Sequence, residues 1–391
     1  MEYMKGIDGL YIQEETAVTL GKFDGVHRGH QKLLSRILEK KNLKSVMFTI
    51  NGRKSGFVLT DEEKRFMLEK TGLSYLIDCP FIPSVSGMEA EDFVREILVN
   101  RLHAKSIVVG KDFHFGYKRG GDASLLLWLQ KKYGFQVEVV EKEQYKGRDI
   151  SSTYVKEALE AGDMELVNDL LGYRYFISGE VLHGRRIGRT LGMPTTNLVP
   201  STKKLLPPNG VYLSRTRIGE QAYYGVTNIG YKPTIGETFR GVETYLFDFD
   251  GDLYGENIDV ELWKFKRPEM KFDSVEHLKN QMQADIAFGK EYFFEKIVSG
   301  CLANLMMLLG VIFIFLGFLC RRYRNIHAKY KGRAEATVVE IVAGHPDEKG
   351  RQEGVHNYFY PVFAYYADGV LIRKRYRYGS NPCKICAESK K

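Results

Sequence analysis

The stretch "TLGKFDGVHRGHQKLL", Thr19–Leu34, decides the first part of the fold. It follows an apolar, β-branched run and leads into an amphipathic run, so it predicts a strand, a turn and a helix. The turn lies at the carboxyl end of its strand, where open parallel sheets bind ligands. The free N–H groups and the positive dipole end of the helix favour phosphate there. His27 and His30 can therefore face one phosphate; a helix cap that carries two solvent-exposed histidines is the alternative.

Strands and helices continue to alternate over residues 16–160. Apolar, β-branched runs recur between amphipathic stretches, which is typical of a parallel sheet with helices on both faces. Over about 175–268, short strands separated by Gly, Pro and Asp replace this alternation and predict a small antiparallel barrel. Residues 273–297 predict one amphipathic helix that closes the second domain, with Asp273 or Ser274 as its N-cap.

Composition separates the C-terminal end from the rest of the chain. Residues 321–391 hold 15 Lys and Arg against 7 Asp and Glu, whereas residues 1–320 hold 42 of each. We therefore expect the first 320 residues not to bind nucleic acid. Five scattered cysteines and the lack of an apolar leader favour a reducing, cytoplasmic location. Residues 302–320 are apolar except for Asn304 and are long enough to span a bilayer; a buried core helix is the alternative.

Several motifs resemble those of one enzyme family. "GKFDGVHRGH" at 21–30 resembles the Gly-x-Phe-Asp-Gly-x-His-x-Gly-His signature of the nucleotidyltransferase module in bacterial bifunctional riboflavin kinase/FAD synthetases. "VVGKDFHFGYKRGGD" at 108–122 and "DISSTYVKEAL" at 149–159 resemble other motifs of that module. "GRTLGMPTTNL" at 188–198 and "RPEMKFDSVEHLKNQ" at 267–281 resemble riboflavin kinase motifs, in the family's order. The resemblance covers roughly residues 15–295.

The resemblance implies a domain order and two reactions. An α/β nucleotidyltransferase domain with a Rossmann-like parallel sheet is expected at 1–172, and a flavokinase antiparallel β-barrel with its C-terminal helix at 173–298. A transmembrane helix at 302–320 and a small β-rich basic tail at 321–391 are expected to follow. The enzyme would phosphorylate riboflavin to FMN with ATP and adenylylate FMN to FAD with release of pyrophosphate. Mg²⁺ would be the cofactor, and the sequence leaves the oligomeric state open.

In the nucleotidyltransferase domain, the resemblance implies a catalytic role for His27 and His30. The FMN phosphate is already anionic, so the site needs stabilisation of charge at the α-phosphorus rather than a strong base. The residues expected to bind nucleotide in this domain are Gly21, Phe23, Asp24, Gly25, Gly29, Gly110, Asp112, Arg119, Ser151, Ser152, Thr153 and Lys156. Asp24 also suits a structural role in the turn or a metal role.

In the kinase domain, the resemblance implies that Glu243, on an expected strand, is the general base for the riboflavin hydroxyl. Thr195 and Asn197, in an expected turn after Pro194, would hold Mg²⁺, which prefers oxygen ligands. The glycines and arginines expected to cover the nucleotide are Gly184, Arg185, Gly188, Arg189 and Gly192. An Asx-type turn for Thr195 and Asn197, and a surface carboxylate for Glu243, are the structural alternatives.

The sequence departs from the family at three places in the first domain. His114 and Lys156 stand where the family often has Arg, and residues 48–56 lack a Pro-His-Pro loop. A lysine keeps the charge but loses the bidentate fork of arginine. Two alternatives therefore stay open: a riboflavin kinase with a decayed transferase half, and a membrane-tethered protein that only binds nucleotide or flavin.

The expected membrane helix raises a question of topology. The basic run "RRYR" after it predicts a cytoplasmic tail, yet the ATP-dependent domains before it also require the cytoplasm. One full crossing cannot satisfy both. Either the charge rule fails, or the segment is re-entrant or interfacial, or the chain fuses two originally separate genes; we favour a fusion. In each case the sequence predicts cytoplasmic catalytic domains, with an anchor on their C-terminal side.

Overall fold

The computed structural model describes residues 1–52, 55–183, 193–233, 238–328, 337–344, 358–367 and 370–375. Two compact units divide the chain, residues 1–297 and residues 298–391. The long helix α9 begins in the first unit and ends in the second.

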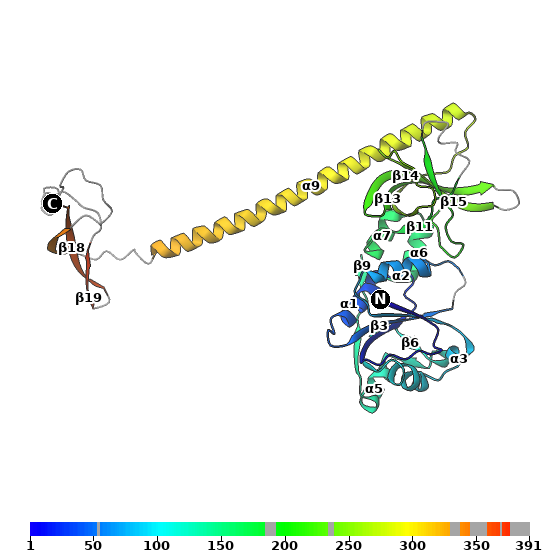
Figure 1. Ribbon diagram of the computed structural model, residues 1–391, viewed down its shortest axis with the longest axis horizontal. Helices are drawn as coiled ribbons and strands as arrows, with labels where there is room; N and C mark the ends of the chain where they lie inside the picture. Colours follow the sequence, from blue (N-terminus) through cyan, green and yellow to red (C-terminus); the bar gives the residue numbers. More distant parts are fainter. Residues whose placement is uncertain are drawn as a thin grey trace. The chain divides into compact units, whose positions relative to one another are not determined.

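The N-terminal part of the first unit is built on a six-stranded sheet in the order β1-β4-β3-β2-β5-β8 (Figure 1). All of its pairings are parallel, as the alternation of strands and helices predicts. The strands are β1 (Glu2–Lys5), β2 (Thr16–Gly21), β3 (Lys44–Asn51), β4 (Tyr75–Pro80), β5 (Ala104–Gly110) and β8 (Gln136–Val140).

Helices cover both faces of this sheet because successive strand residues point to opposite sides. Ala17 packs in one cluster with α1 (Arg28–Leu38) and α2 (Asp61–Glu69). Its neighbour Val18 packs in another, with α5 (Ala123–Tyr133) and the π-helical segment Phe93–Val99. The remaining elements of this part are α3 (Pro83–Ser86), α4 (Ala90–Asp92), the hairpin β6 (His114–Phe115) and β7 (Gly121–Asp122), the 3₁₀ turn Tyr117–Arg119, and the hairpin β9 (Gln144–Tyr145) and β10 (Arg148–Asp149).

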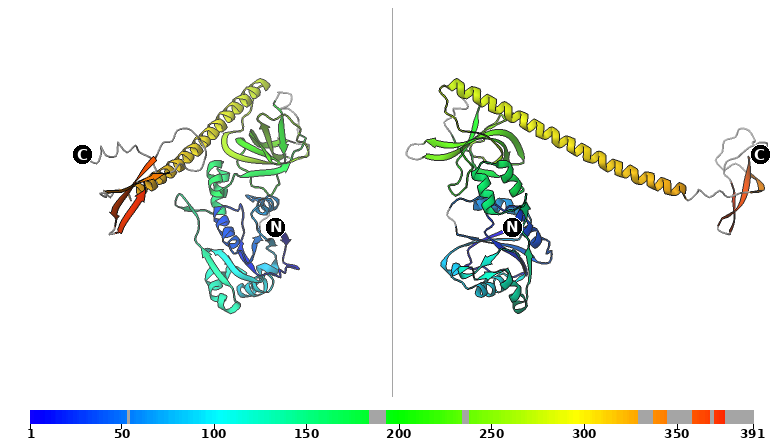
Figure 2. Two further views of the ribbon diagram at one scale, coloured as in Figure 1. Left: turned by 60° about the vertical axis from the view of Figure 1, so that its left-hand side comes forward. Right: turned by 180° about the vertical axis from the view of Figure 1, so that it is seen from behind.

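Two short helices join this part to the next. Helices α6 (Ser152–Glu160) and α7 (Met164–Leu171) lie between the parallel sheet and the second sheet in Figure 1 and in both views of Figure 2. Their buried side chains, Leu159 and Leu170 among them, share one hydrophobic cluster with barrel residues such as Tyr212 and Val260. The core of the barrel therefore extends into these two joining helices.

The second sheet is antiparallel and has the order β11-β16-β13-β14-β15-β12. Val181, just after β11, pairs with Leu198 of β12, and the Leu182 N–H donates to the Asn197 carbonyl over 2.8 Å. These contacts bring the ends of the two edge strands together, so the sheet is curled, as expected for a barrel. The strands are β11 (Phe176–Glu180), β12 (Thr195–Leu198), β13 (Gly210–Ile218), β14 (Gln221–Pro233), β15 (Thr238–Leu246) and β16 (Asn257–Pro268).

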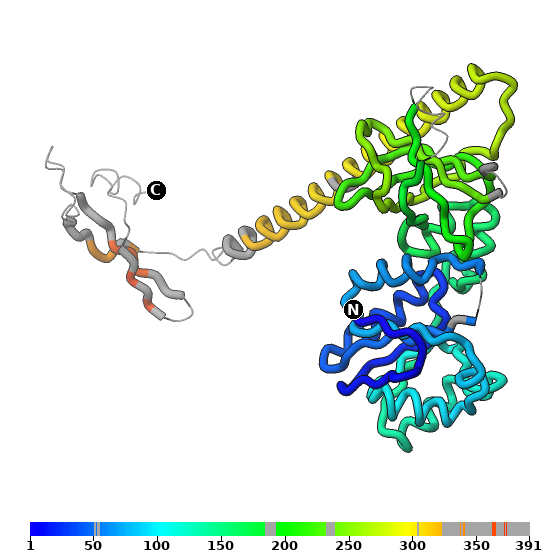
Figure 3. The backbone as a smooth tube through the Cα atoms, turned by 45° about the vertical axis from the view of Figure 1, so that its right-hand side comes forward, coloured from blue at the N-terminus to red at the C-terminus, as the bar shows by residue number. Residues whose placement is uncertain are grey.

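Helix α9 (Val275–Ala328) is continuous over 54 residues, whereas the sequence predicts separate helices at 273–297 and 302–320. No proline lies between these segments, and a single Gly300 costs too little to break a helix. The Ser274 hydroxyl accepts from the His277 N–H over 3.1 Å, so Ser274 is the N-cap. The N-terminal half of α9 packs on the barrel through Phe293, next to Tyr224 and Trp263. Figure 3 shows this part of the helix running along the barrel.

The second unit contains the C-terminal part of α9 and a three-stranded antiparallel sheet, β17-β18-β19, which agrees with the small β-rich tail that the sequence predicts. Its strands are β17 (Thr337–Gly344), β18 (Tyr358–Ala367) and β19 (Val370–Arg375). By length and composition, α9 is also the one helix of the described residues that could cross a membrane.

Candidate active sites

The turn between β2 and α1 brings the two expected histidines together. The His27 and His30 rings stack with centroids 3.6 Å apart, and Phe23 packs edge-on against His30 at 5.1 Å. Both Nδ1 atoms are buried and have no hydrogen-bond partner among the described residues. A pair of buried ring nitrogens at the N-terminus of a helix fits a ligand that accepts hydrogen bonds, such as a phosphate.

Burial sets the charge of these histidines. Desolvation is the largest cause and lowers the pKa of His27 to about 4, although the nearby Asp24 carboxylate acts in the opposite direction. Desolvation, followed by the neighbouring His27 and Lys64, holds the pKa of His30 well below its usual range. Both imidazoles are therefore neutral at pH 7, and each can donate one N–H but supplies no positive charge.

The backbone of this turn is strained. Phe23 and Val26 have positive φ values of 44° and 36°, which are rare for residues with a Cβ and rarest for a β-branched one. Gly25 has φ of 81°, and a Cβ there would lie 3.0 Å from the Val58 side chain. A Cβ on Gly29 would lie 3.3 Å from the His27 ring, so glycine lets that imidazole lie against the helix.

Contacts from distant segments hold this conformation in place. Asp24 forms an ion pair with Lys156 of α6 over 2.5 Å, and its Oδ1 accepts from the Val58 N–H over 2.8 Å. The Ser152 hydroxyl donates to the Asp24 carbonyl over 2.9 Å, and Tyr173 donates to the Gly25 carbonyl over 2.6 Å. Asp24 and Lys156 therefore pair with each other, and Asp24 also ties the turn to Val58.

The remaining expected residues of this site lie on neighbouring loops. Ser151 is the N-cap of α6 and accepts from the Tyr154 N–H, and Thr153 lies in the first turn of that helix. Gly21 is the last residue of β2, and Gly110 is the last residue of β5, the strand next to β2 in the sheet. Asp112 is paired with Lys142 over 3.0 Å, and Arg119 contacts the His114 ring over 3.2 Å.

The kinase residues meet on two paired strands. Asn197 of β12 lies directly opposite Glu243 of β15, and Thr195 is two residues from Asn197 on the same strand. Side chains of a cross-strand pair and of residues i and i+2 point to the same face. This face therefore carries a carboxylate, an amide and a hydroxyl at neighbouring positions of two paired strands, and their oxygen atoms are of the kind that Mg²⁺ prefers.

The expected turn at Thr195 and Asn197 is wrong, because both residues lie in strand β12. Thr195 and Thr196 are β-branched, and pairing with β15 satisfies their backbone groups. The expectation of a strand at Glu243 is confirmed. Gly184, Arg185, Gly188, Arg189 and Gly192 lie outside the described residues.

Two polar residues near Glu243 escaped the sequence analysis. Asn228 of β14 lies opposite Glu243 on its other side. The Glu269 carboxylate lies against Gly230, which is two residues after Asn228 in β14, and any side chain at position 230 would overlap this carboxylate. Glu269 also accepts a hydrogen bond from the Asn209 side chain over 3.1 Å. Glu269 belongs to the "RPEMKF" motif, which was the available signal. An open surface pocket of about 390 Å³ begins at the next residue and is lined by Met270, Lys271, Phe272, Asp273, His277, Asn280 and Gln281.

Comparisons with known proteins cover both sites. The chain matches the FAD synthetase family model over residues 11–154 and the riboflavin kinase family model over residues 171–293. It is 36% identical over 309 residues to the bifunctional riboflavin kinase/FMN adenylyltransferase of Buchnera aphidicola subsp. Acyrthosiphon pisum, with 75% of this chain and 98% of that protein covered. The protein of the same name from Escherichia coli K12 is 36% identical over 308 residues, with the same coverage of 75% and 98%.

One solved structure shares the fold of most of the chain. It is a crystal structure from Streptococcus pneumoniae described as a macrolide-efflux protein, with a TM-score of 0.65 and 28% sequence identity. The match covers 73% of this chain and 97% of that one.

Proposed function

The chain belongs to the bifunctional riboflavin kinase/FMN adenylyltransferases, and on this basis we propose which residues carry each reaction. The enzyme transfers the γ-phosphoryl group of ATP to riboflavin, which gives FMN, and the adenylyl group of ATP to FMN, which gives FAD and pyrophosphate. Matches to both family models favour two activities over the kinase-only alternative and over a protein that only binds nucleotide. We assign residues 1–172 to adenylyl transfer and residues 173–298 to the kinase.

We propose that the turn at 21–30 binds the reacting phosphates in adenylyl transfer. The stacked pair His27 and His30, with its buried ring nitrogens, is the observation that carries this assignment. The FMN phosphate oxygen attacks the α-phosphorus of ATP, and the bond to the pyrophosphate oxygen breaks. Neutral imidazole N–H groups and the first N–H groups of α1 donate to oxygens that become more negative as the phosphorus becomes five-coordinate.

For the kinase, we propose that Glu243 accepts the proton of the riboflavin 5′-hydroxyl as the oxygen attacks the γ-phosphorus. The bond from the γ-phosphorus to the bridging oxygen of ATP breaks, and ADP leaves. Its place opposite Asn197 supports this role, because the substrate hydroxyl and the nucleotide phosphates must meet on one face. Thr195 and Asn197 would hold Mg²⁺ together with phosphate oxygens of ATP. When bound, the ion would neutralise part of the phosphate charge.

The apolar part of α9 supports a further proposal about location. Residues 302–320 are apolar except for Asn304 and are exposed where described, so we propose that they associate with a bilayer while the catalytic domains stay cytoplasmic.

Two substitutions in the full chain test the division of labour. His27→Ala is expected to lower FAD formation from FMN by roughly a hundredfold and to leave FMN formation within twofold. Glu243→Gln is expected to lower FMN formation and to spare FAD formation from FMN. Glu220 is an exposed carboxylate between β13 and β14, and Glu220→Gln is expected to change neither rate. Each reaction is measured separately by product chromatography. If His27→Ala slowed FMN formation and spared FAD formation, the assignment of the two sites would be wrong.

A further inference from the structure

The two catalytic parts are joined by a short pairing of extended segments. The Phe57 N–H donates to the Lys203 carbonyl over 2.9 Å, and the Leu205 N–H donates to the Phe57 carbonyl over 2.7 Å. These bonds place Lys204, a residue of the kinase part, beside Val58 of the adenylyltransferase part. Because Lys204 follows β12 by six residues, the junction begins close to the kinase strand that carries Asn197.

Lys204 is buried at this junction, and its side chain contacts both the adenylyltransferase part and the start of the barrel. Its side chain is 1% exposed, and its ammonium lies 2.6 Å from Glu63 Oε2 and 2.8 Å from the Val58 carbonyl oxygen. It also lies over the Tyr175 ring, 4.4 Å from the centroid. Glu63, the partner carboxylate, accepts in addition from the Thr60 N–H over 2.9 Å and from the Ser178 N–H over 3.1 Å.

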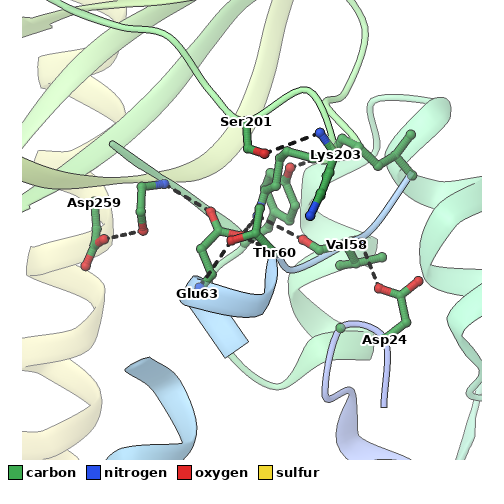
Figure 4. A network of polar contacts seen from close by, with 12 residues as sticks. Asp24, Val58, Thr60, Glu63, Ser201, Lys203 and Asp259 are labelled. Carbon is green, nitrogen blue, oxygen red and sulfur yellow. Dashed lines mark hydrogen bonds and ion pairs between the residues drawn. The ribbon is translucent and has the colours of Figure 1, made fainter. Parts of the chain in front are cut away.

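This network continues directly into the phosphate turn, as Figure 4 shows for Glu63, Val58 and Asp24. The Lys204 ammonium donates to the Val58 carbonyl, and the Val58 N–H donates to Asp24 Oδ1 over 2.8 Å. The Val58 side chain also packs closely against Gly25. Asp24 and Gly25 lie three and two residues before His27, so a shift of Val58 would move the backbone that places this imidazole.

Stability alone does not account for a lysine at position 204. A buried ion pair is about as stable as an apolar pair of similar volume, and often less so. The ammonium differs from an apolar side chain in that it fixes the Val58 carbonyl and the Glu63 carboxylate by short, directed bonds. We propose that Lys204, contributed by the kinase part, is a positioning residue for adenylyl transfer, an inference that rests on the proposed role of the turn at 21–30.

Lys204→Met in the full chain tests this role, because it keeps the length of the side chain and removes the ammonium. The kcat of FAD formation from FMN is expected to fall roughly tenfold or more, since a displacement of about 1 Å can cost up to a hundredfold. The kcat of FMN formation in the same preparation is expected to stay within twofold. Lys203→Met, which alters the exposed neighbouring lysine, is the matched control and is expected to change neither rate.

The ratio of the two rates separates positioning from loss of folded protein. A purely structural lysine would lower both rates in parallel, or neither, and either result would overturn the proposal. If Lys204→Met leaves Glu63 unpaired and prevents folding, the double variant Glu63→Gln/Lys204→Met removes both charges and is judged by the same ratio. His27→Ala is measured in parallel, so that a failure of the phosphate turn to act in adenylyl transfer is recognised independently of Lys204.

Discussion

At the scale of single residues, the two histidines of the turn act as neutral groups. The lowered pKa of His27, about 4, means that its imidazole is uncharged wherever the enzyme is active near pH 7. Neutral rings can stack at 3.6 Å without the repulsion that two imidazolium ions would meet. Lys156, 2.5 Å from Asp24, brings a positive charge to the turn. A lysine suits this position because one ammonium reaches both Asp24 and the Gly56 carbonyl, 2.7 Å away.

The same pKa predicts how acid affects stability. The unfolded chain binds a proton at His27 near pH 6.5, whereas the folded chain binds it only near pH 4, so stability present above pH 6.5 is lost as the pH falls through this window. As the pH falls from 7 to 5, protonation of His27 in the unfolded chain should lower the free energy of unfolding by about 2 kcal/mol. Urea unfolding of the wild type and of His27→Gln at both pH values measures this contribution. An equal loss of stability in the two proteins would show that His27 is not the titrating group.

At the scale of helices and strands, periodicity and turn residues predicted most of both sheets. The apolar run AKSIVVG at 104–110 coincides with β5 and the run GVYLSRTRI at 210–218 with β13, because strand-forming residues are concentrated in both. The edge strand β1 was missed because its few residues carry mixed polarity and pair only with the distant β4. Motifs located His27, His30 and Glu243, but burial, ring stacking and the pairing of Asn197 with Glu243 depend on contacts between distant segments, which one sequence does not encode locally.

The attachment of α9 to the barrel gives a prediction at this scale. Phe293 is 2% exposed and stacks on Tyr224 at 4.1 Å, whereas the adjacent Phe294 is 68% exposed. Phe293→Ala should therefore lower the free energy of unfolding by about 3–5 kcal/mol, and Phe294→Ala by less than about 1 kcal/mol. Urea unfolding followed by tryptophan fluorescence reports it, because Trp263 packs against Phe293. Equal losses in both variants would contradict the packing of α9 through Phe293.

At the scale of the whole molecule, the chain combines an enzyme that makes flavin cofactors with an apolar helical segment whose exposure to water is unfavourable. Large side chains of α9 such as Leu302, Phe313 and Ile314 are 58%, 71% and 75% exposed. An apolar surface of this kind marks a membrane or a protein contact. The basic residues that follow could also hold the chain on an anionic lipid surface without insertion, and that binding would be screened by salt.

Fractionation of cells that express the full chain distinguishes these modes. Insertion of 302–320 predicts that both flavin activities sediment with membranes, remain there in high salt and are released by detergent. The double variant Phe313→Asp/Ile314→Asp should move the chain to the supernatant with both activities intact, because each aspartate near the centre of a span costs about 2.5–3.5 kcal/mol. Release of the wild type by salt alone would assign the attachment to the basic tail. Recovery of the wild type in the supernatant at low salt would show that α9 does not attach the chain to membranes.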